Sequence, residues 1–201
     1  MEFQLPVNAN PEKQKRLNKL EIVTKKTKNG NHITINLDED IGEPSEYRGI
    51  VTKLREASDK DIVELHISSW GGYLDSAVLL VNELVLTKAK TIAVIHTAAS
   101  AATLVAFACD QIETLPTSAV MLHNFSVQQS GKGQEVRAKA EFDEKQFSKI
   151  CDLLYVGILT EDEIKAMQED KDIWLLGCEL KERMERLQWS PVRKRGSYAC
   201  I

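Results

Sequence analysis

The sequence predicts an α/β fold with a mostly parallel sheet, and three observations support this. Apolar residues recur every three to four positions in some segments, and they alternate or run continuously in others. After an initial hairpin, the two kinds of segment follow in the order helix, strand, helix, strand, helix, strand. Helices that connect successive strands imply parallel pairing, with the helices packed beside the sheet.

Each element has its own pattern. The pair Asn29-Gly30 is a strong turn signal and predicts a hairpin, whose second strand alternates apolar and polar residues. The run at 91–97 is β-branched and largely apolar, which favours a buried parallel strand. A capping box from Thr160 to Glu163 opens a late helix. The predicted strands are 20–26, 32–37, 62–67, 91–97 and 119–123, and the predicted helices are 47–54, one from about Asp75, 98–109, 134–156 and one from Thr160.

The helix predicted over 134–156 is long and charged, with a narrow apolar seam that Asp143 interrupts. Such a seam suits a helix that packs against a partner subunit, and packing on its own domain is the alternative. We expect one domain at 20–189, preceded by a polar arm at 1–19 and followed by a basic, solvated tail at 190–201.

Composition narrows the function classes. The 201 residues include 26 Lys and Arg against 30 Asp and Glu, and this mild acidity argues against binding nucleic acid through its phosphates. No apolar stretch approaches the ~18 residues of a membrane span. The four cysteines form no CxxC pair, which indicates a reducing, cytoplasmic location. Metal-ligand spacing, a P-loop and GxGxxG are absent, so we expect no metal, no cofactor and no ATP hydrolysis by this chain.

Two glycines, Gly71 and Gly72, directly follow the strand predicted at 62–67. They allow a sharp turn that presents bare N–H groups to an anion or to an extended peptide. A plain strand-to-helix turn is the alternative.

Ser100 lies among alanines where a strand is expected to give way to a helix. Small neighbours would give a substrate carbonyl access to its hydroxyl, and an oxyanion formed there would point at the amide of Ala101. The alternative is that Ser100 only caps the helix. The GxSxG elbow is absent, which argues against an α/β-hydrolase.

A serine nucleophile needs a base and a carboxylate that orients the base. His123 ends an apolar strand and is the candidate base, although a structural histidine is the alternative and His96 is a rival. Asp172, expected between two helices, is the candidate carboxylate. By chemistry alone three further residues compete with it: Asp110, Asp152 and Asp170.

Together these stretches resemble the Clp protease proteolytic subunit, the ClpP family of serine peptidases. The family's Asn-Ser-Pro-Gly-Gly stands here as Ser-Ser-Trp-Gly-Gly at 68–72, and its Gly-Gln-Ala-Ala-Ser-Met as His-Thr-Ala-Ala-Ser-Ala at 96–101. Its Met-Ile-His-Gln stands as Met-Leu-His-Asn at 121–124, and its Arg-Asp segment with a nearby aromatic as Lys-Asp-Ile-Trp at 171–174. The resemblance covers roughly 33–187, with the motifs in the same order and at similar spacing.

The resemblance implies a spiral of repeated β-β-α units, as in ClpP and crotonase folds, with a protruding handle helix. It implies the triad Ser100, His123 and Asp172, and no cofactor. The implied oxyanion hole consists of the amides of Ala101 and of Gly72 or Gly71. The implied substrate-binding residues are Trp70, Phe125 and Ser126. Further implications are stacked heptameric rings, a polypeptide substrate and an AAA+ unfoldase partner that would hydrolyse ATP.

The chain also departs from the family pattern. Trp70 replaces a proline and would reshape the substrate cleft, while the residues before Ile33 do not match the usual axial loops. A divergent or virus-encoded member is therefore expected. Two other functions stay open: an inactive ring subunit that assembles with an active paralogue, and a crotonase-like acyl-CoA enzyme on a related fold.

Overall fold

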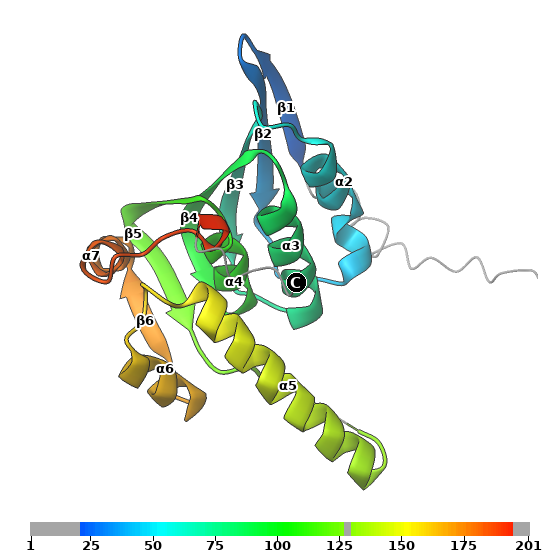
Figure 1. Ribbon diagram of the computed structural model, residues 1–201, viewed down its shortest axis with the longest axis vertical. Helices are drawn as coiled ribbons and strands as arrows, with labels where there is room; N and C mark the ends of the chain where they lie inside the picture. The colour runs from blue at the N-terminus through cyan, green and yellow to red at the C-terminus, as the bar shows by residue number, and fades with distance from the viewer. Residues whose placement is uncertain (1–20, 127–129, 195–201) are drawn as a thin grey trace, which may run out of the picture.

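A six-stranded sheet organises the chain, which a computed structural model describes over residues 21–126 and 130–194 (Figure 1). The strands lie in the order of the sequence: β1 (Ile22–Thr27), β2 (Gly30–Leu37), β3 (Ile62–Ser69), β4 (Lys90–Ala99), β5 (Gln111–Leu122) and β6 (Ile173–Leu176). Strands β2 to β5 pair in parallel, and β1 and β6 pair antiparallel at the two edges. The expected α/β class with a mostly parallel sheet is confirmed.

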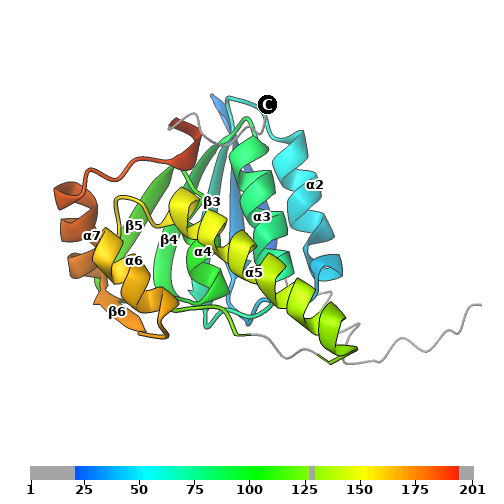
Figure 2. The same cartoon turned by 60° about the horizontal axis from the view of Figure 1, so that its bottom comes forward.

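Helices connect the parallel strands and cover one face of the sheet (Figure 2). Those described are α2 (Arg48–Glu56), α3 (Leu74–Leu86), α4 (Ala101–Phe107), α5 (Gly133–Leu154), α6 (Glu161–Gln168) and α7 (Gly177–Arg186), with short 3-10 turns η1 (Pro44–Tyr47) and η2 (Val192–Lys194). Leu65, Ile95 and Leu84 are fully buried between the sheet and these helices. Each such side chain contributes about 1.5–3 kcal/mol through burial.

The opposite face of the sheet carries the alternate strand residues, which stay partly exposed. We call this the open face and define it by Asn36, Glu64, His66, Val94 and Met121. The alternation follows from the two-residue period of a strand, which sends neighbouring side chains to opposite faces. Within the described ranges, no helix is long and apolar enough to cross a membrane.

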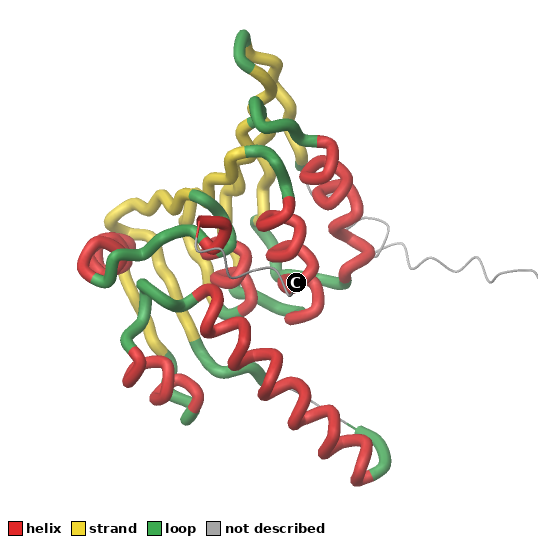
Figure 3. Tube along the Cα trace, in the orientation of Figure 1, coloured by secondary structure: helices red, strands yellow, loops and turns green. Residues whose placement is uncertain are grey.

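Helix α5 projects from the body of the protein, as the colour-coded tube in Figure 3 also shows. Its buried residues are Asp143, Phe147, Cys151 and Leu154, so only its C-terminal half packs on its own domain. The N-terminal half is largely exposed. The long helix predicted at 134–156 is thus confirmed, over Gly133–Leu154.

The structure corrects three boundaries. The helix expected from residue 98 begins at Ala101, because Ala98 and Ala99 still pair with β3 or β5 in the sheet. Strand β5 begins at Gln111 rather than 119. Asp172 does not lie between two helices, because the short strand β6 follows it and completes the sheet edge.

The tail expected to be solvated is packed over its described part. Val192 is buried, and the Arg193 guanidinium donates to Asp110 Oδ1 at 2.8 Å and to the Ala89 carbonyl at 2.8 Å. Arg193 also bonds the Thr87 carbonyl. Residues 195–201 and the arm at 1–19 lie outside the described ranges.

Candidate active site

Ser100 occupies the hinge between β4 and α4 with φ 53° and ψ −127°. A non-glycine residue in this region costs of order 1–3 kcal/mol and persists only where its surroundings fix it. The Ser100 N–H donates to the Met121 carbonyl at 2.9 Å, and the Ser100 carbonyl accepts from the Thr103 N–H at 3.0 Å and hydroxyl at 2.7 Å. The Ser100 side chain caps no helix N–H. The strained backbone therefore presents the hydroxyl instead of using it to cap α4.

Gly71 fits against this hinge because it has no side chain. A Cβ on Gly71 would lie 2.7 Å from the Ala99 carbonyl oxygen and 2.7 Å from the Ser100 Cβ. The backbone also has φ +100°, a conformation that side-chain-bearing residues rarely adopt. The glycine turn after β3 is therefore in van der Waals contact with the hinge, which a plain strand-to-helix turn does not require.

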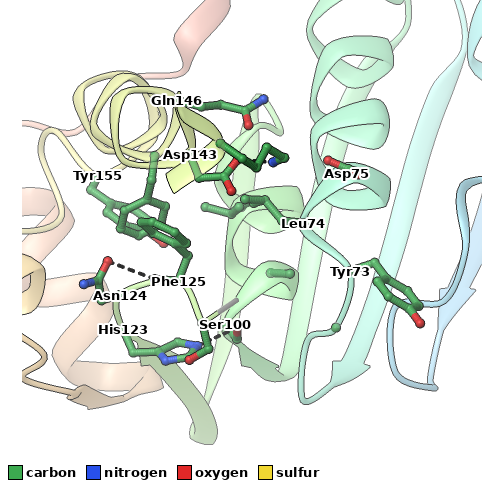
Figure 4. A pocket seen from close by; sticks show the side chains of 16 residues that line it. Tyr73, Leu74, Asp75, Ser100, His123, Asn124, Phe125, Asp143, Gln146 and Tyr155 are labelled. Atoms are coloured by element: carbon green, nitrogen blue, oxygen red, sulfur yellow. Dashed lines mark hydrogen bonds and ion pairs between the residues drawn. The ribbon is translucent and has the colours of Figure 1, made fainter. Parts of the chain in front are cut away.

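His123 directly follows β5 and reaches Ser100. Its Nε2 lies 2.6 Å from the Ser100 Oγ, and Figure 4 shows the two side chains pointing toward each other. With the proton on Nδ1, the hydroxyl donates to Nε2, which is the arrangement of a serine nucleophile and its base. The rival His96 instead stacks on His66 across the open face, with ring centroids 5.8 Å apart. Ser100 and His123 thus form a dyad.

Asp172 stands opposite His123 in the sheet register. The pairing of β5 with β6 ends at Leu122 and Ile173, so the next antiparallel positions are His123 and Asp172. Opposed residues have Cα atoms about 4.5–5.5 Å apart and side chains on the same face. Asp172 is exposed, and in the described part of the chain no hydrogen bond joins it to His123.

Two rival carboxylates have other partners. Asp110 binds Arg193 and accepts from the Thr91 N–H at 2.8 Å. Asp170 Oδ1 accepts from Asn124 Nδ2 at 3.0 Å. This bond ties the turn before β6 to Asn124, the neighbour of His123.

Two residues with free backbone amides line the same cleft as the dyad. The Gly71 N–H donates to the buried Ser69 Oγ at 3.2 Å. The N–H groups of Gly72 and Ala101 have no acceptor within residues 21–126 and 130–194. Gly72 is held in place because Ile41 bonds both of its neighbours, at 2.6 Å and 2.9 Å. Of the two glycines expected to serve an oxyanion, Gly72 is thus the one with an available amide.

The cleft has a volume of about 600 Å³ and extends from the dyad to α5 (Figure 4). Its polar walls include Asp75, Asp143 and Gln146. Its apolar lining is Leu74, Leu104, Phe125, Phe147 and Tyr155, and Ser126 also lines it. Phe125 packs on Phe147 with centroids 5.3 Å apart. Burial raises the pKa of Tyr155, so this phenol is neutral across the physiological range.

Trp70 and Trp174 lie outside the cleft lining and face each other. Their ring centroids are 6.4 Å apart, and the rings are tilted by 60°. The sequence motifs assigned Trp70 to the substrate and gave Trp174 no role of its own. The alternation of Trp174 with the buried Ile173 and Leu175 was the signal that it is exposed. Within the described ranges, no three or more His, Cys, Asp or Glu side chains lie together in a way that could hold a metal ion.

Comparison with known proteins agrees with the α/β fold. A family model for the Clp protease matches residues 23–182, which is 160 of the 201 residues. A search of curated proteins finds no match to the chain. The matched range includes both members of the dyad, the glycine turn, the whole of α5 and Asp172. The chain therefore belongs to the Clp protease family.

Proposed function

We propose that this chain is a serine endopeptidase that cleaves unfolded or flexible polypeptides through an acyl-enzyme. The single observation that carries the proposal is the 2.6 Å contact between Ser100 Oγ and His123 Nε2 at a strained hinge. Membership of a peptidase family makes an amide bond the expected target.

In the proposed reaction, the substrate carbonyl enters the cleft and the Ser100 Oγ attacks it while His123 Nε2 takes the hydroxyl proton. The amides of Gly72 and Ala101 donate to the oxyanion, and loss of one such donor typically costs 10²–10³-fold in kcat. The C–N bond then breaks, and His123 returns the proton to the leaving amine. Water, activated by the same imidazole, hydrolyses the acyl-enzyme.

We assign Asp172 the role of orienting His123. The two residues lie directly beyond the last β5–β6 pair, Leu122 with Ile173, and this supports the role. A carboxylate at Nδ1–H would fix the tautomer that the reaction requires. Because Asp172 is exposed, its side chain is free to rotate toward the imidazole without displacing buried atoms.

An extended substrate fits the cleft better than a folded one. The proposed binding groups are the backbone after Gly72 and the residues Phe125 and Ser126, all of which line the cleft. Strand-like pairing of peptide backbone needs a chain free of its own secondary structure. The apolar lining around Phe125 and Phe147 suits an apolar side chain on the acyl side.

Members of this family generally form oligomeric rings. We propose stacked heptameric rings for this chain, with α5 at the contact between rings and an AAA+ unfoldase as the ATP-hydrolysing partner. The exposed N-terminal half of α5 supports this, since Phe142 is 56% exposed there. The free thiols fit the proposal of a reducing, cytoplasmic compartment. Burial also raises the pKa of the Cys109 and Cys151 thiols to about 12, so both stay protonated and unreactive.

Hydrolysis of a fluorescein-labelled, chemically unfolded polypeptide by the full chain tests the proposal. Wild-type protein should release acid-soluble peptides, and Ser100→Ala should lower kcat on the order of 10⁴–10⁶-fold. Ser130→Ala, which changes an exposed serine outside the site, is the matched control and should retain full activity. Activity that survives in Ser100→Ala at the wild-type rate would refute the assignment.

A second candidate, an inactive ring subunit, is favoured by one observation: Asp172 has no hydrogen bond to His123 in the described residues. Such a subunit would assemble with an active paralogue. Stable co-purification with a second subunit, together with no hydrolysis by the isolated chain, would select this alternative.

A further inference from the structure

Two indole side chains beside the dyad are exposed and have no place in the reaction described above. Trp70 is 62% exposed and Trp174 is 56% exposed. Neither lines the cleft that holds the free amides. Leaving two large aromatic rings together in water is unfavourable, and such patches mark contact sites for a partner molecule.

The two rings reach toward each other across the sheet. Trp70 follows β3, whereas Trp174 belongs to β6, and β4 and β5 lie between them. Three strand spacings of about 4.8 Å separate the backbones by roughly 14 Å. The ring centroids are only 6.4 Å apart, so both side chains lean inward over the ends of β4 and β5.

This position is next to the nucleophile. Trp70 precedes Gly71, which is in contact with the Ser100 hinge. Trp174 pairs in register with Met121, whose carbonyl accepts the Ser100 N–H at 2.9 Å. The indoles therefore flank the dyad on the open face, while the cleft extends from the dyad toward α5.

The chemistry decides which part of a substrate meets the indoles. The amides of Gly72 and Ala101 line the cleft, so the attacked carbonyl and the residue that carries it belong there. The leaving nitrogen must meet His123, which protonates it. His123 continues β5, the neighbour of β6, so the chain beyond the cleaved bond leaves past His123 toward Trp174.

We propose that Trp70 and Trp174 form a subsite for an aromatic or large apolar side chain on the residue directly after the cleaved bond. This inference rests on the proposed peptidase function and adds its specificity on the leaving side. Tilted indole rings offer both a face and an edge, which suits an aromatic partner. The fragment released with the proton from His123 would then begin with such a residue.

The subsite can be tested in the full-length protein with two peptides. They share the same acyl side and differ only in the residue after the cleaved bond, which is Phe in one and Gly in the other. Wild-type kcat/KM should favour Phe by about tenfold or more, which is the effect expected for burying one aromatic ring. Trp70→Ala and Trp174→Ala should each bring this ratio close to one, and Trp174→Phe should keep part of it.

Leu86→Ala is the matched control. Leu86 is 70% exposed at the far end of α3, about 18 Å along the helix from the cleft residue Leu74, and the control should keep the Phe-to-Gly ratio. A ratio near one in the wild type, or a ratio that Trp174→Ala leaves unchanged, overturns the subsite. So does a shift of oligomeric state in the tryptophan variants with an unchanged ratio, since the patch would then be an interface.

A direct binding measurement completes the test. Two of the three tryptophans belong to the exposed pair, so intrinsic emission reports on it. Titration of the Ser100→Ala protein with the Phe peptide should shift the emission to the blue, and the Gly peptide should do so far less. Equal shifts overturn the subsite. If a fluorophosphonate fails to modify wild-type Ser100, the proposed function fails and the subsite with it, whereas modification without Phe preference refutes the subsite alone.

Discussion

Replacing Gly71 with alanine is the sharpest perturbation of the hinge. The new Cβ would lie 2.7 Å from both the Ala99 carbonyl oxygen and the Ser100 Cβ, and 3.0 Å from the Ala101 nitrogen. These are the atoms that place the nucleophile and one oxyanion donor. The backbone at φ +100° would also be strained for any side chain.

The size of the effect follows from these distances. Relieving the contacts to ordinary separation, from 2.7 to 3.4 Å, moves the Ser100 hinge by about 0.7 Å. A displacement near 1 Å at a reacting group costs about 10²-fold in rate, so we expect kcat to fall by roughly that factor. Strain and overpacking together should lower the free energy of unfolding by about 2–4 kcal/mol. A protein of ordinary stability stays folded after such a loss.

Both effects of Gly71→Ala can be measured on the same preparations, kcat by peptide hydrolysis and the free energy of unfolding by urea denaturation. Gly133→Ala is the matched control, because its Cβ would meet nothing nearer than the Arg137 guanidinium at 3.9 Å. The control should keep kcat and should not lower the unfolding midpoint, because alanine is tolerated at a helical position of this kind. Gly71→Ala with wild-type kcat and an unchanged midpoint would refute the packing of the glycine turn against the hinge.

Four further changes have defined outcomes. Asp172→Asn should lower kcat by about 10³–10⁴-fold with the unfolding midpoint unchanged, and a loss below tenfold would remove Asp172 from the triad. Ser100→Gly should be about 1 kcal/mol more stable than Ser100→Ala in urea, because glycine relieves the positive φ. Hydrogen bonds, first from the Ser58 backbone, lower the pKa of Asp61 to about 2. The stability that this provides is present above pH 4 and is lost as the pH falls toward 2. Asp61→Asn should therefore lower the free energy of unfolding by about 1–2 kcal/mol at pH 7 and flatten the acid side of the plot of unfolding free energy against pH. Arg193→Ala should cost about 2–3 kcal/mol in thermal unfolding, whereas the exposed Lys194→Ala should cost less than about 0.5.

The sequence was informative wherever pattern and local chemistry agree. Alternation along 32–37 and helical spacing in α5 identified these elements, because burial on one face dictates the spacing of apolar residues. The capping box at Thr160 is formed, with the Glu163 N–H donating to the threonine hydroxyl at 3.3 Å. Local side-chain bonds of this kind do not depend on the rest of the fold.

The elements whose bounds were predicted wrongly are those that depend on pairing with strands far away in the sequence. The alanines before Ser100 favour a helix by propensity, yet Ala98 and Ala99 extend β4 because two neighbouring strands satisfy their backbone groups. Strand β6 has four residues, and only its pairing with β5 makes it a strand. Propensity over so short a segment cannot reveal a partner far away in the sequence.

The site was predictable as residues but not as geometry. Ser100 and His123 were identified and lie in contact, whereas Asp172 was identified without its position opposite His123 in the register. Nothing in the sequence separated Gly71 from Gly72, because the bond from the Gly71 N–H to the Ser69 hydroxyl is a property of the folded turn. The pairing of Trp70 with Trp174 likewise depends on two strands that fold between them.

The most direct measurement of the central claim is the site of covalent modification by a fluorophosphonate, mapped by mass spectrometry on the full-length chain. We expect one adduct, on the Ser100 hydroxyl, that is absent in Ser100→Ala and forms far more slowly in His123→Ala. No adduct on the wild type in any oligomeric state, or an adduct on a different serine, would contradict it.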